Sequence, residues 1–409
     1  MALSVRIEAL DARDVADVVA EANAEGRRIA VEGGASKAEV GRPFERDVTL
    51  SLARVCGVVD YEPSELVLTA RAGTPLAEVE ALLAGHGQRL AFEPMDHGPL
   101  LGGPSGRGTL GGIIAANASG PRRIKVGAAR DHFLGFSGVS GRGEAFKAGG
   151  KVVKNVTGYD LAKLMAGSWG TLAVLTEVTL KVMPRPPEAA TLVIVGAADD
   201  VAAKAMGAAL GAPSEVTAAA HLPAGVAARA PAAAVAEAGG PVTLIRIEGV
   251  GAAMTPAAFA VAGALPGLVL GDRLDAGDTE RLWRWVRDVE AFAGDARQVW
   301  RLSLAPMDGP AAVERIGRTL EAEAFYDWAG GLVWLACADD ADAAAPIRAA
   351  VGALGGHATL VRANAAVRAA VGAFQPEPPA LAALSRRIKA GFDPNGVLNP
   401  GRMWPAAEA

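Results

Sequence analysis

Cysteine, histidine and aromatic residues are scarce in this chain of 409 residues. The two cysteines, Cys56 and Cys337, stand far apart in apolar runs, which favours buried thiols over a disulfide and fits a reducing compartment. An iron–sulfur cluster needs several thiolates in a close motif, and the chain has no such motif. We therefore expect no disulfide framework and no cluster held by this chain itself.

Blocks of like charge are also missing. The net charge is −5 with both signs interspersed, which argues against nucleic acid as the main partner. The first ten residues include Arg6 and Glu8 and lack the apolar core of a signal peptide. Residues 250–271 carry no charge and are long enough to span a bilayer, but they are rich in alanine and interrupted by proline. We expect Pro266 to separate a helix from a short strand over 268–270, and hence no direct membrane span.

The five histidines are spread over the chain, and no two have the spacing of a metal-ligand pair. The sequence therefore predicts no metal site and offers no clear base for removing a hydroxyl proton, so the catalytic residues stay unknown. These histidines are His86, His97, His132, His221 and His357.

Glycine, by contrast, is abundant, and residues 98–120 are the richest stretch. Glycine lets the backbone adopt positive φ angles, and successive free N–H groups in such a loop form an anion site. Thr109 is a plausible N-cap for a short helix, whose N-terminus would add positive charge. The stretch predicts a cradle for a pyrophosphate. A surface loop without a ligand is the alternative.

A smaller loop of the same kind comes earlier. An apolar strand over 28–32 runs directly into Gly33-Gly34-Ala35-Ser36-Lys37. The spacing is neither that of a P-loop nor that of the Rossmann G-x-G-x-x-G motif. A strand followed by two glycines, a hydroxyl and a lysine nevertheless suits a phosphate group. Two glycine loops about seventy residues apart suggest one pyrophosphate held from two sides.

Seven segments, taken in order, resemble the FAD-binding domain of the vanillyl-alcohol oxidase family, also called the PCMH-type flavin fold. Within that family the sequence is most similar to the E subunits of bacterial glycolate oxidases. The likeness is strong over residues 1–185 and good in the C-terminal tail, and it rests on layout alone in the middle. The segments are 32–37, 108–112, 117–120, 126–131, 154–161, 167–177 and 392–402.

The resemblance implies a non-covalent FAD, because no cysteine lies near the loops and His97 is better explained as a structural or solvated histidine. It implies that the backbone supplies most contacts, with Lys37 as a cation. The implied pyrophosphate residues are Gly33, Gly34, Ala35, Ser36 and Lys37 on one side and Pro104, Gly108, Thr109, Gly111 and Gly112 on the other. Along the ribityl chain and flavin ring the resemblance places Asn117, Ala118, Ser119 and Gly120; at the adenine, Gly170 and Val174; and reaching back from the tail, Asn399 and Arg402.

Each of these side chains also has an interpretation that involves no ligand. Lys37 could be exposed to solvent, and Asn117 could be an ordinary helix C-cap. Arg130 and Asp131 could pair on the surface.

The expected fold class is α+β. Residues 1–187 are expected to form a two-part PCMH-type FAD-binding domain and 188–370 a cap, with 371–409 returning to the flavin site as a helix and tail. The cap should hold an antiparallel sheet with helices on one face. Expected strands in the first domain cover 29–32, 48–52, 55–61, 66–70, 90–92, 133–138, 144–147, 151–154 and 171–182. Two helices are expected there, one from the N-cap Asp11 to about residue 25 and one from the N-cap Thr74, with Pro75 as its first residue, to 85. In the cap, expected strands cover 191–195, 242–248, 299–304, 331–336 and 359–363, and expected helices 199–210, 256–264, 279–293, 311–322 and 341–354, with the alanine tract 218–238 expected as a helix and loop.

The resemblance implies an FAD-linked oxidoreductase: the FAD-binding subunit of a glycolate oxidase complex. A sister flavin subunit would oxidise glycolate to glyoxylate, and an iron–sulfur subunit would carry the electrons onward. Related 2-hydroxy-acid dehydrogenases carry clustered histidines and a glutamate that this chain lacks, which disfavours a stand-alone dehydrogenase of a 2-hydroxy acid or alcohol. The intact glycine loops disfavour a scaffold that has lost its flavin. We expect a cytoplasmic protein. Attachment to the inner face of the membrane through its partners is a further possibility that the sequence does not decide.

Two further surfaces suggest binding. Trp283 and Trp285 stand among arginines in an expected helix, which is typical of a partner surface, although a core tryptophan with solvated arginines is the alternative. Arg246, Arg301 and Arg362 each lie in an expected cap strand and could hold an anion, although structural or surface arginines are the alternative.

Overall fold

The computed structural model describes residues 4–151, 158–249, 260, 269–271 and 273–404. The chain divides into two compact units. Unit 1 consists of Met1–Ser119, Gly127–Arg185 and Gly372–Ala409, and unit 2 of Gly120–Val126 and Pro186–Val371. In this division residues 120–126 and 186–187, which the expected first domain includes, belong to unit 2, and so does Val371.

Unit 1 begins with a small parallel sheet. β3 (Val48–Ser51) lies between β1 (Val5–Glu8) and β2 (Ile29–Glu32). α1 (Ala12–Glu25) follows β1, and the Asp11 carboxylate caps it by accepting hydrogen bonds from the N–H groups of the second and third residues that follow. The apolar face of α1 packs into the same core as the sheet, as its spacing predicts.

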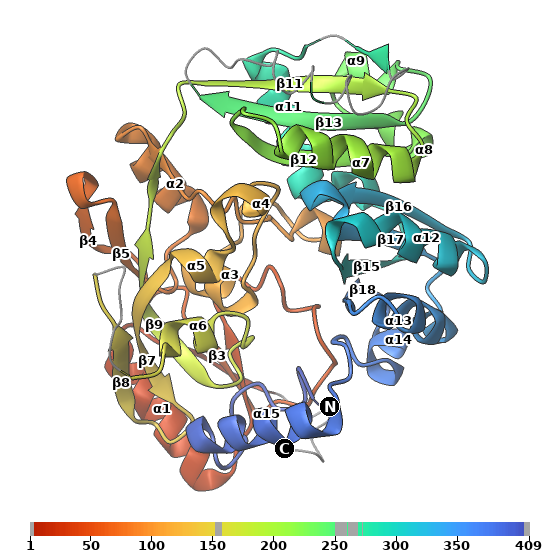
Figure 1. Ribbon diagram of the computed structural model, residues 1–409. Helices are drawn as coiled ribbons and strands as arrows, with labels where there is room; N and C mark the ends of the chain where they lie inside the picture. The colour runs from red at the N-terminus through yellow and green to blue at the C-terminus, as the bar shows by residue number, and fades with distance from the viewer. Residues whose placement is uncertain (1–3, 152–157, 250–259, 261–268, 272, 405–409) are drawn as a thin grey trace. The chain divides into compact units, whose positions relative to one another are not determined.

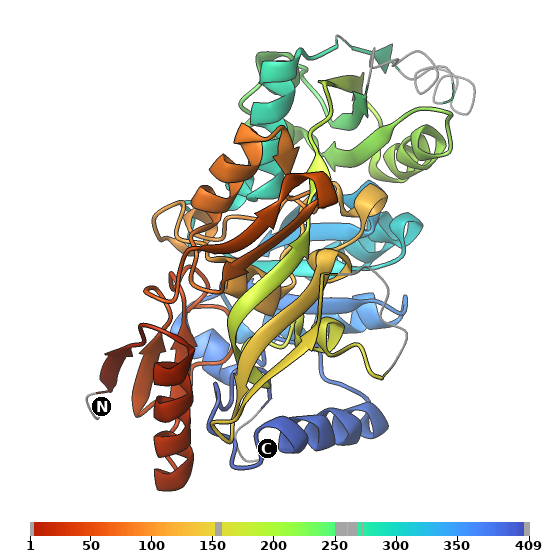
Figure 2. The ribbon, with the colours of Figure 1, turned by 90° about the vertical axis from the view of Figure 1, so that its left-hand side faces the viewer.

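The second sheet of unit 1 has five antiparallel strands in the order β4-β5-β9-β7-β8. Its longest members, β7 and β9, run side by side and are yellow and yellow-green in Figure 2. α3 shares a buried core with this sheet. The elements are β4 (Val58–Glu62), β5 (Val67–Arg71), β7 (Phe133–Ser140), β8 (Ala145–Gly149), β9 (Ala173–Lys181) and α3 (Leu110–Ala116).

Two local expectations in unit 1 are wrong. The strand expected over 90–92 is replaced by the two-residue β6 (Gln88–Arg89). α2 (Leu76–Gly85) begins one residue after the expected start, because the Thr74 hydroxyl does not cap it. That hydroxyl instead donates to the Arg71 carbonyl oxygen at 2.7 Å. The strand expected over 151–154 lies mostly outside the described residues, as does the helix over 256–264.

The C-terminal part of the chain belongs to unit 1. α15 (Pro379–Phe392) is drawn in blue in Figure 1, and the turn after it lies beside α1, where Asn395 Nδ2 donates to Asn23 Oδ1 at 2.9 Å. Beyond it, Leu398 forms a parallel bridge to Ile29, so the tail extends the small sheet next to β2. Residues near the end of the sequence are thereby placed at the carboxyl end of β2, where the first glycine loop begins.

Unit 2 is built on one eight-stranded antiparallel sheet, as the α+β class with an antiparallel cap predicts. The strand order is β14-β11-β13-β12-β16-β17-β15-β18. The strands are β11 (Glu188–Val195), β12 (Val216–Leu222), β13 (Val242–Gly249), β14 (Val269–Leu270), β15 (Gln298–Ser303), β16 (Ala322–Asp327), β17 (Leu332–Cys337) and β18 (His357–Arg362). The longer helices are α7 (Asp199–Leu210), α11 (Ala276–Arg287), α12 (Gly309–Gly317) and α13 (Ala344–Gly352).

Three expectations for unit 2 are wrong. The alanine tract begins as the fully buried strand β12, because small side chains suit the crowded centre of a sheet covered on both faces. β16 was not foreseen, since alternating small and large residues there carried no clear strand signal. The helices cover both faces: Thr191 of β11 contacts α11, whereas its neighbour Leu192, which points the other way, shares a core with α7.

The tryptophans of α11 are core residues. Trp283 and Trp285 are both buried, and the Trp283 indole N–H donates to the Thr191 hydroxyl at 3.0 Å. Arg281 and Arg284 form exposed ion pairs within the helix. The two tryptophans are therefore not exposed for a partner, as the alternative interpretation of this helix has it.

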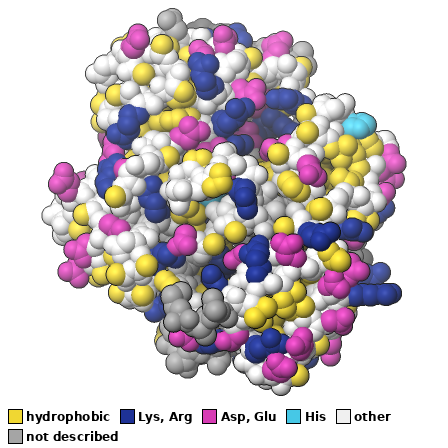
Figure 3. Space-filling model, turned by 180° about the vertical axis from the view of Figure 1, so that it is seen from behind, with side chains coloured by type: hydrophobic (Ala, Val, Ile, Leu, Met, Phe, Trp, Pro, Cys, Tyr) yellow, Lys and Arg dark blue, Asp and Glu magenta, His cyan; other side chains and the backbone are white. Residues whose placement is uncertain are grey.

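The surface carries no dominant charge on the face shown in Figure 3, where acidic and basic side chains are interspersed. Within the part of the chain that the structure describes, no helix combines the length and the apolar character needed to cross a bilayer. Most of the uncharged stretch 250–271 lies outside that part, and its end forms the edge strand β14 near the expected position.

Candidate functional site

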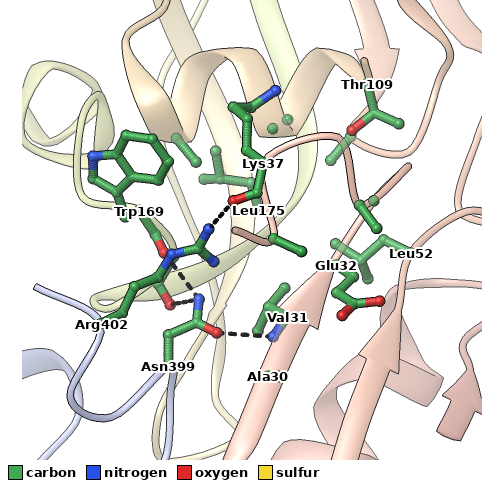
Figure 4. Close-up of a pocket in the computed structure, with 18 of the residues that line it drawn as sticks. Ala30, Val31, Glu32, Lys37, Leu52, Thr109, Trp169, Leu175, Asn399 and Arg402 are labelled. Carbon is green, nitrogen blue, oxygen red and sulfur yellow. Dashed lines mark hydrogen bonds between the residues drawn. The ribbon is translucent and has the colours of Figure 1, made fainter. Parts of the chain in front are cut away.

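A cavity in unit 1 collects residues that are far apart in the sequence. Most of its lining comes from the end of β2 with the loop after it, the start of α3, the loop that leads into β9, and the C-terminal tail (Figure 4), and Leu52 and Ala72 complete it. The sheet register brings the first and last of these together, because Leu398 pairs with Ile29. The predicted residues that line it are Gly33, Gly34, Ala35, Ser36, Lys37, Thr109, Gly111, Gly112, Gly170, Asn399 and Arg402.

The two glycine loops lie against each other at this cavity. A Cβ atom on Gly33 would stand 2.2 Å from the Thr109 hydroxyl oxygen, and one on Gly34 would stand 1.8 Å from the Arg107 carbonyl oxygen. Any side chain at either position would force the loops apart. The two glycines are therefore required by loop-to-loop packing, whatever the cavity holds.

The first loop supplies free backbone donors. In the described part of the chain, no backbone N–H group of residues 33–37 donates a hydrogen bond to another protein group. Ala35 has a left-handed φ of 57°, so the direction of the backbone reverses within the loop. Successive unpaired N–H groups around such a reversal form a concave anion site.

The start of α3 offers fewer free backbone N–H donors to the cavity than the sequence suggested. The N–H groups of Leu110 and Gly111 donate to the carbonyl oxygens of Thr74 and Ala72, at 3.0 and 2.8 Å. Gly111 also packs closely on Ala72, since a Cβ there would stand 2.7 Å from the alanine methyl carbon. Thr109 holds the N-cap position but makes no capping hydrogen bond. The helix start is therefore mainly an anchor to the second sheet.

Two buried cations belong to the cavity. Lys37 is only 8% exposed, which contradicts the solvent-exposed alternative, and its ammonium group bonds the Ser36 hydroxyl at 3.2 Å. Burial, reinforced by the charge of Arg402, lowers the pKa of Lys37 to about 8. Burial likewise lowers the pKa of the Arg402 guanidinium to about 10.

The Arg402 guanidinium is only partly satisfied by the protein. Its Nη2 donates to the Lys37 carbonyl oxygen at 2.7 Å, and the group lies 5.2 Å from the centre of the Trp169 ring. Its buried Nε–H has no hydrogen-bond partner among the described residues. Glu32 also lines the cavity, but its carboxylate pairs with Arg6 at 3.0 Å. Two poorly neutralised cations beside free N–H groups fit an anion such as a pyrophosphate.

Asn399 organises the site through the backbone. Its Oδ1 accepts a hydrogen bond from the Val31 N–H at 3.0 Å, and its Nδ2 donates to the carbonyl oxygens of Trp169 and Gly170 at 2.9 and 3.2 Å (Figure 4). These bonds tie the tail to β2 and to the loop before β9. The amide is thereby committed to protein groups, so it positions the loop rather than presenting itself to a ligand.

A buried ion pair pins the tail that carries Asn399 and Arg402. Lys389 of α15 is paired with Asp393, the residue that follows this helix, and the Lys389 ammonium also donates to the carbonyl oxygens of Thr171 and Leu398 at 2.7 and 3.1 Å. The Asp393 carboxylate accepts from two backbone N–H groups of the turn at 2.9 and 3.0 Å. The pair was not foreseen, because i, i+4 charges on a helix are usually solvated.

Several predicted residues do not line this cavity. Asn117 has a left-handed φ of 48° at the C-cap of α3, as the alternative interpretation has it, and its Oδ1 accepts from the Arg130 N–H at 3.0 Å. The Ser119 hydroxyl accepts from the Ala129 N–H at 2.9 Å. Asp131 of α5 (Ala129–His132) accepts from the Ala128 N–H at 2.9 Å at the start of that helix rather than pairing with Arg130. The predicted residues outside the lining are Pro104, Gly108, Asn117, Ala118, Ser119, Gly120 and Val174.

The most prominent residue that the sequence reasoning missed is Trp169. It has a left-handed φ of 53°, lies next to Gly170 and contacts Phe374, with ring centres 5.6 Å apart. Phe44 and Arg46 also line the cavity. The one available signal was a tryptophan between small residues at the start of a buried strand, in a segment already recognised as part of the resemblance.

The histidines do not gather at this cavity. Each of them lies outside its lining, and His221 bonds Thr243 and Asp199 inside unit 2. No group of three potential metal ligands occurs among the described residues.

Comparison with known proteins gives the family. Residues 4–149 match a family model described as an FAD binding domain. The chain is 34% identical to the glycolate oxidase subunit GlcE of Escherichia coli (strain K12) over 382 residues, which cover 92% of each chain. It is 33% identical to a D-2-hydroxyglutarate dehydrogenase of Xanthomonas citri pv. viticola, over 46% of this chain and 38% of that protein. The fold is similar to that of 4-ethylphenol oxidase from Gulosibacter chungangensis, with a TM-score of 0.70 and 17% identity over 99% of this chain and 90% of the other. It is also similar to p-cresol methylhydroxylase, with a TM-score of 0.69 and 16% identity over 99% and 89%.

Proposed function

We propose that this chain, which belongs to the family of the FAD-linked glycolate oxidase subunit GlcE, is the FAD-binding subunit of a complex that oxidises glycolate to glyoxylate. FAD, when bound, supplies a two-electron acceptor that no amino-acid side chain provides. The chain would assemble with a flavin-containing catalytic subunit and an iron–sulfur subunit in the cytoplasm.

The observation that carries the proposal is the pair of buried cations beside the free loop. A pyrophosphate brings about two negative charges, and Lys37 and Arg402 bring two positive ones. The N–H groups of residues 33–37 would donate to its oxygens. The unpaired Nε–H of Arg402 is a further donor at the same place.

The chain's own residues then have separate tasks. The first glycine loop, Lys37 and Arg402 bind the pyrophosphate, and Gly112 keeps the space beside the Lys37 ammonium open. Asn399 and the pair Lys389–Asp393 hold the tail in place. We assign none of these groups to the removal of a substrate proton, because no histidine lines this cavity among the described residues and the Glu32 carboxylate there is paired with Arg6.

Absorption spectroscopy of the purified chain tests the proposal. We expect flavin bands after incubation with FAD, and we expect anaerobic glycolate to bleach them only when the partner subunits are present. A chain that never retains flavin would refute the proposed cofactor site. Flavin that glycolate bleaches in the isolated chain would instead show a complete dehydrogenase, contrary to the proposal.

A further inference from the structure

Three arginines in strands of unit 2 differ sharply in how they are neutralised. Arg246 bonds the Thr217 hydroxyl at 3.2 Å and lies 3.6 Å from the Glu248 carboxylate. Arg362 pairs with Asp295 at 2.6 Å and also donates to two backbone carbonyl oxygens. Within the described residues, Arg301 makes neither a hydrogen bond nor an ion pair. The half-buried guanidinium of Arg301 therefore has five N–H donors and no protein acceptor among the described residues.

The Arg301 guanidinium lies over a tryptophan that also holds a second arginine. Its carbon Cζ is 5.0 Å from the centre of the Trp328 ring, and Cζ of Arg123, in α4 (Arg123–Val126), is 4.1 Å from the same centre. The two guanidinium carbons are therefore at most about 9 Å apart. Both guanidinium groups therefore approach the same ring, and the charge of Arg123 acts on Arg301.

Trp328 is held firmly in its position. Its indole N–H donates to the Gly120 carbonyl oxygen at 2.9 Å, and its backbone N–H donates to the Asp327 carboxylate at 2.7 Å. Trp328 and Ala329 both have left-handed φ angles, of 52° and 57°, which are costly for residues with side chains. The turn Trp328–Gly330 thus keeps a strained backbone that fixes the ring on which both arginines stack.

The same sheet face carries a third titratable group. His357 of β18 pairs with Ser303 of β15, and directly paired residues point to the same face. Arg301 lies two residues from Ser303 and so shares that face as well. Arg123, Arg301 and His357, together with the Trp328 ring that both arginines contact, form the Trp328 cluster.

Electrostatics within the Trp328 cluster favours an anion. Burial and then the charge of Arg123 lower the pKa of Arg301 to about 10, while Asp327 opposes this shift. Loss of solvent, followed by the charges of Arg301 and Arg123, lowers the pKa of His357. Among the described residues, Asp327 is the one carboxylate that raises the pKa of Arg301, against the two arginines of the cluster. A bound anion would relieve the repulsion.

We propose that Arg301 and Arg123, stacked on Trp328, form a binding site in unit 2 for the carboxylate of a small hydroxy acid. The ligand class rests on the proposed function, since glycolate is such an acid, whereas the anion site rests on the geometry alone. Guanidinium groups match the two oxygens of a carboxylate with paired N–H donors. Inorganic phosphate presents similar oxygens and is the competing ligand.

The test is calorimetric titration of the full-length chain, with and without added FAD, with glycolate and separately with inorganic phosphate. Arg301→Met keeps the aliphatic volume and removes the charge, and we expect it to weaken glycolate binding by on the order of 10–100-fold. Arg123→Met should weaken binding in the same direction. The matched control is Arg318→Met, because Arg318 is an exposed arginine of the same unit, paired with Glu314.

Equal glycolate affinity in the Arg301→Met variant and the wild type, or no glycolate binding by the wild type, would overturn the inference. Phosphate binding that excludes glycolate would overturn the ligand class. Titration with FAD separates this inference from the proposed function. If the wild type fails to bind FAD but Arg301→Met abolishes glycolate binding, the anion site stands and the proposed function falls. If FAD binds normally and Arg301→Met leaves glycolate binding intact, the inference alone falls.

Discussion

Replacing Lys37 with methionine should stabilise the protein without FAD and weaken its affinity for FAD. Methionine keeps the length of the side chain and removes a charge that burial disfavours. A substitution that only disturbed the packing would instead lower both the stability and the affinity for FAD. Stability without FAD and affinity for FAD therefore change in opposite directions only if Lys37 is a buried cation that binds an anion.

The magnitude follows from the pKa of Lys37. Burial lowers it from 10.5 to about 8, so the folded protein releases this proton more readily than the unfolded chain does. Between pH 8 and 10.5 the unfolded chain binds more protons, and the free energy of unfolding rises with pH across this window. Below pH 8 the charged lysine lowers the free energy of unfolding by about 3 kcal/mol. Lys37→Met should therefore raise the free energy of unfolding by an amount of that order at pH 7. Loss of the charged contact to the pyrophosphate should raise the Kd for FAD by on the order of 10–100-fold.

Urea unfolding of the FAD-free protein at pH 7 and pH 10 measures the first effect, and fluorescence titration with FAD measures the second. The wild-type affinity for FAD should fall above pH 8, by up to about tenfold per pH unit, because binding requires the protonated lysine. The matched control is Lys163→Met, since Lys163 is a half-exposed lysine of α6 (Leu161–Met165) in unit 1. A variant Lys37→Met that is less stable at pH 7 than the wild type, or that binds FAD equally well, would refute the reasoning.

Three further predictions concern the framework of the cavity. Lys389→Met should lower the free energy of unfolding by about 3–5 kcal/mol in urea, since it leaves the Asp393 carboxylate buried without its cation, and the control Asp393→Asn with Lys389→Met should restore part of the loss. Asn399→Ala should cost about 1–3 kcal/mol by the same assay and weaken FAD binding, because three backbone groups lose their partner; unchanged affinity would argue against tail positioning. Gly34→Ala should abolish FAD retention during gel filtration, because the new methyl group would meet the Arg107 carbonyl oxygen at 1.8 Å, and normal retention would contradict the packing of the loops.

Local sequence patterns were enough to find the first loop. An apolar strand that runs into Gly33 and Gly34, followed by a hydroxyl and Lys37, is a contiguous signal, and these residues do line the cavity. The antiparallel sheet of unit 2 also followed from the rhythm of strands and helices. Patterns of this kind depend on neighbours in the sequence, which a single chain displays.

Other features depend on contacts between distant residues and left no local sign. Trp169 lines the cavity because the Asn399 amide holds its carbonyl group from the far end of the chain. Lys389 resembles an ordinary surface lysine on an amphipathic helix, and only the fold shows that it is buried. The N–H group of Gly111 was expected to face a ligand, yet it bonds Ala72 across a sheet edge that the sequence does not reveal.

Fluorescence titration of the purified, FAD-free chain with FAD tests the central claim most directly, with the wild type compared to Arg402→Met. The account predicts saturable binding of one FAD by the wild type, and affinity lower by on the order of tenfold or more in the variant, because a buried guanidinium with an unpaired donor is lost. Absence of saturable binding by the wild type, or equal affinity in the two proteins, would contradict the assignment of this cavity to FAD.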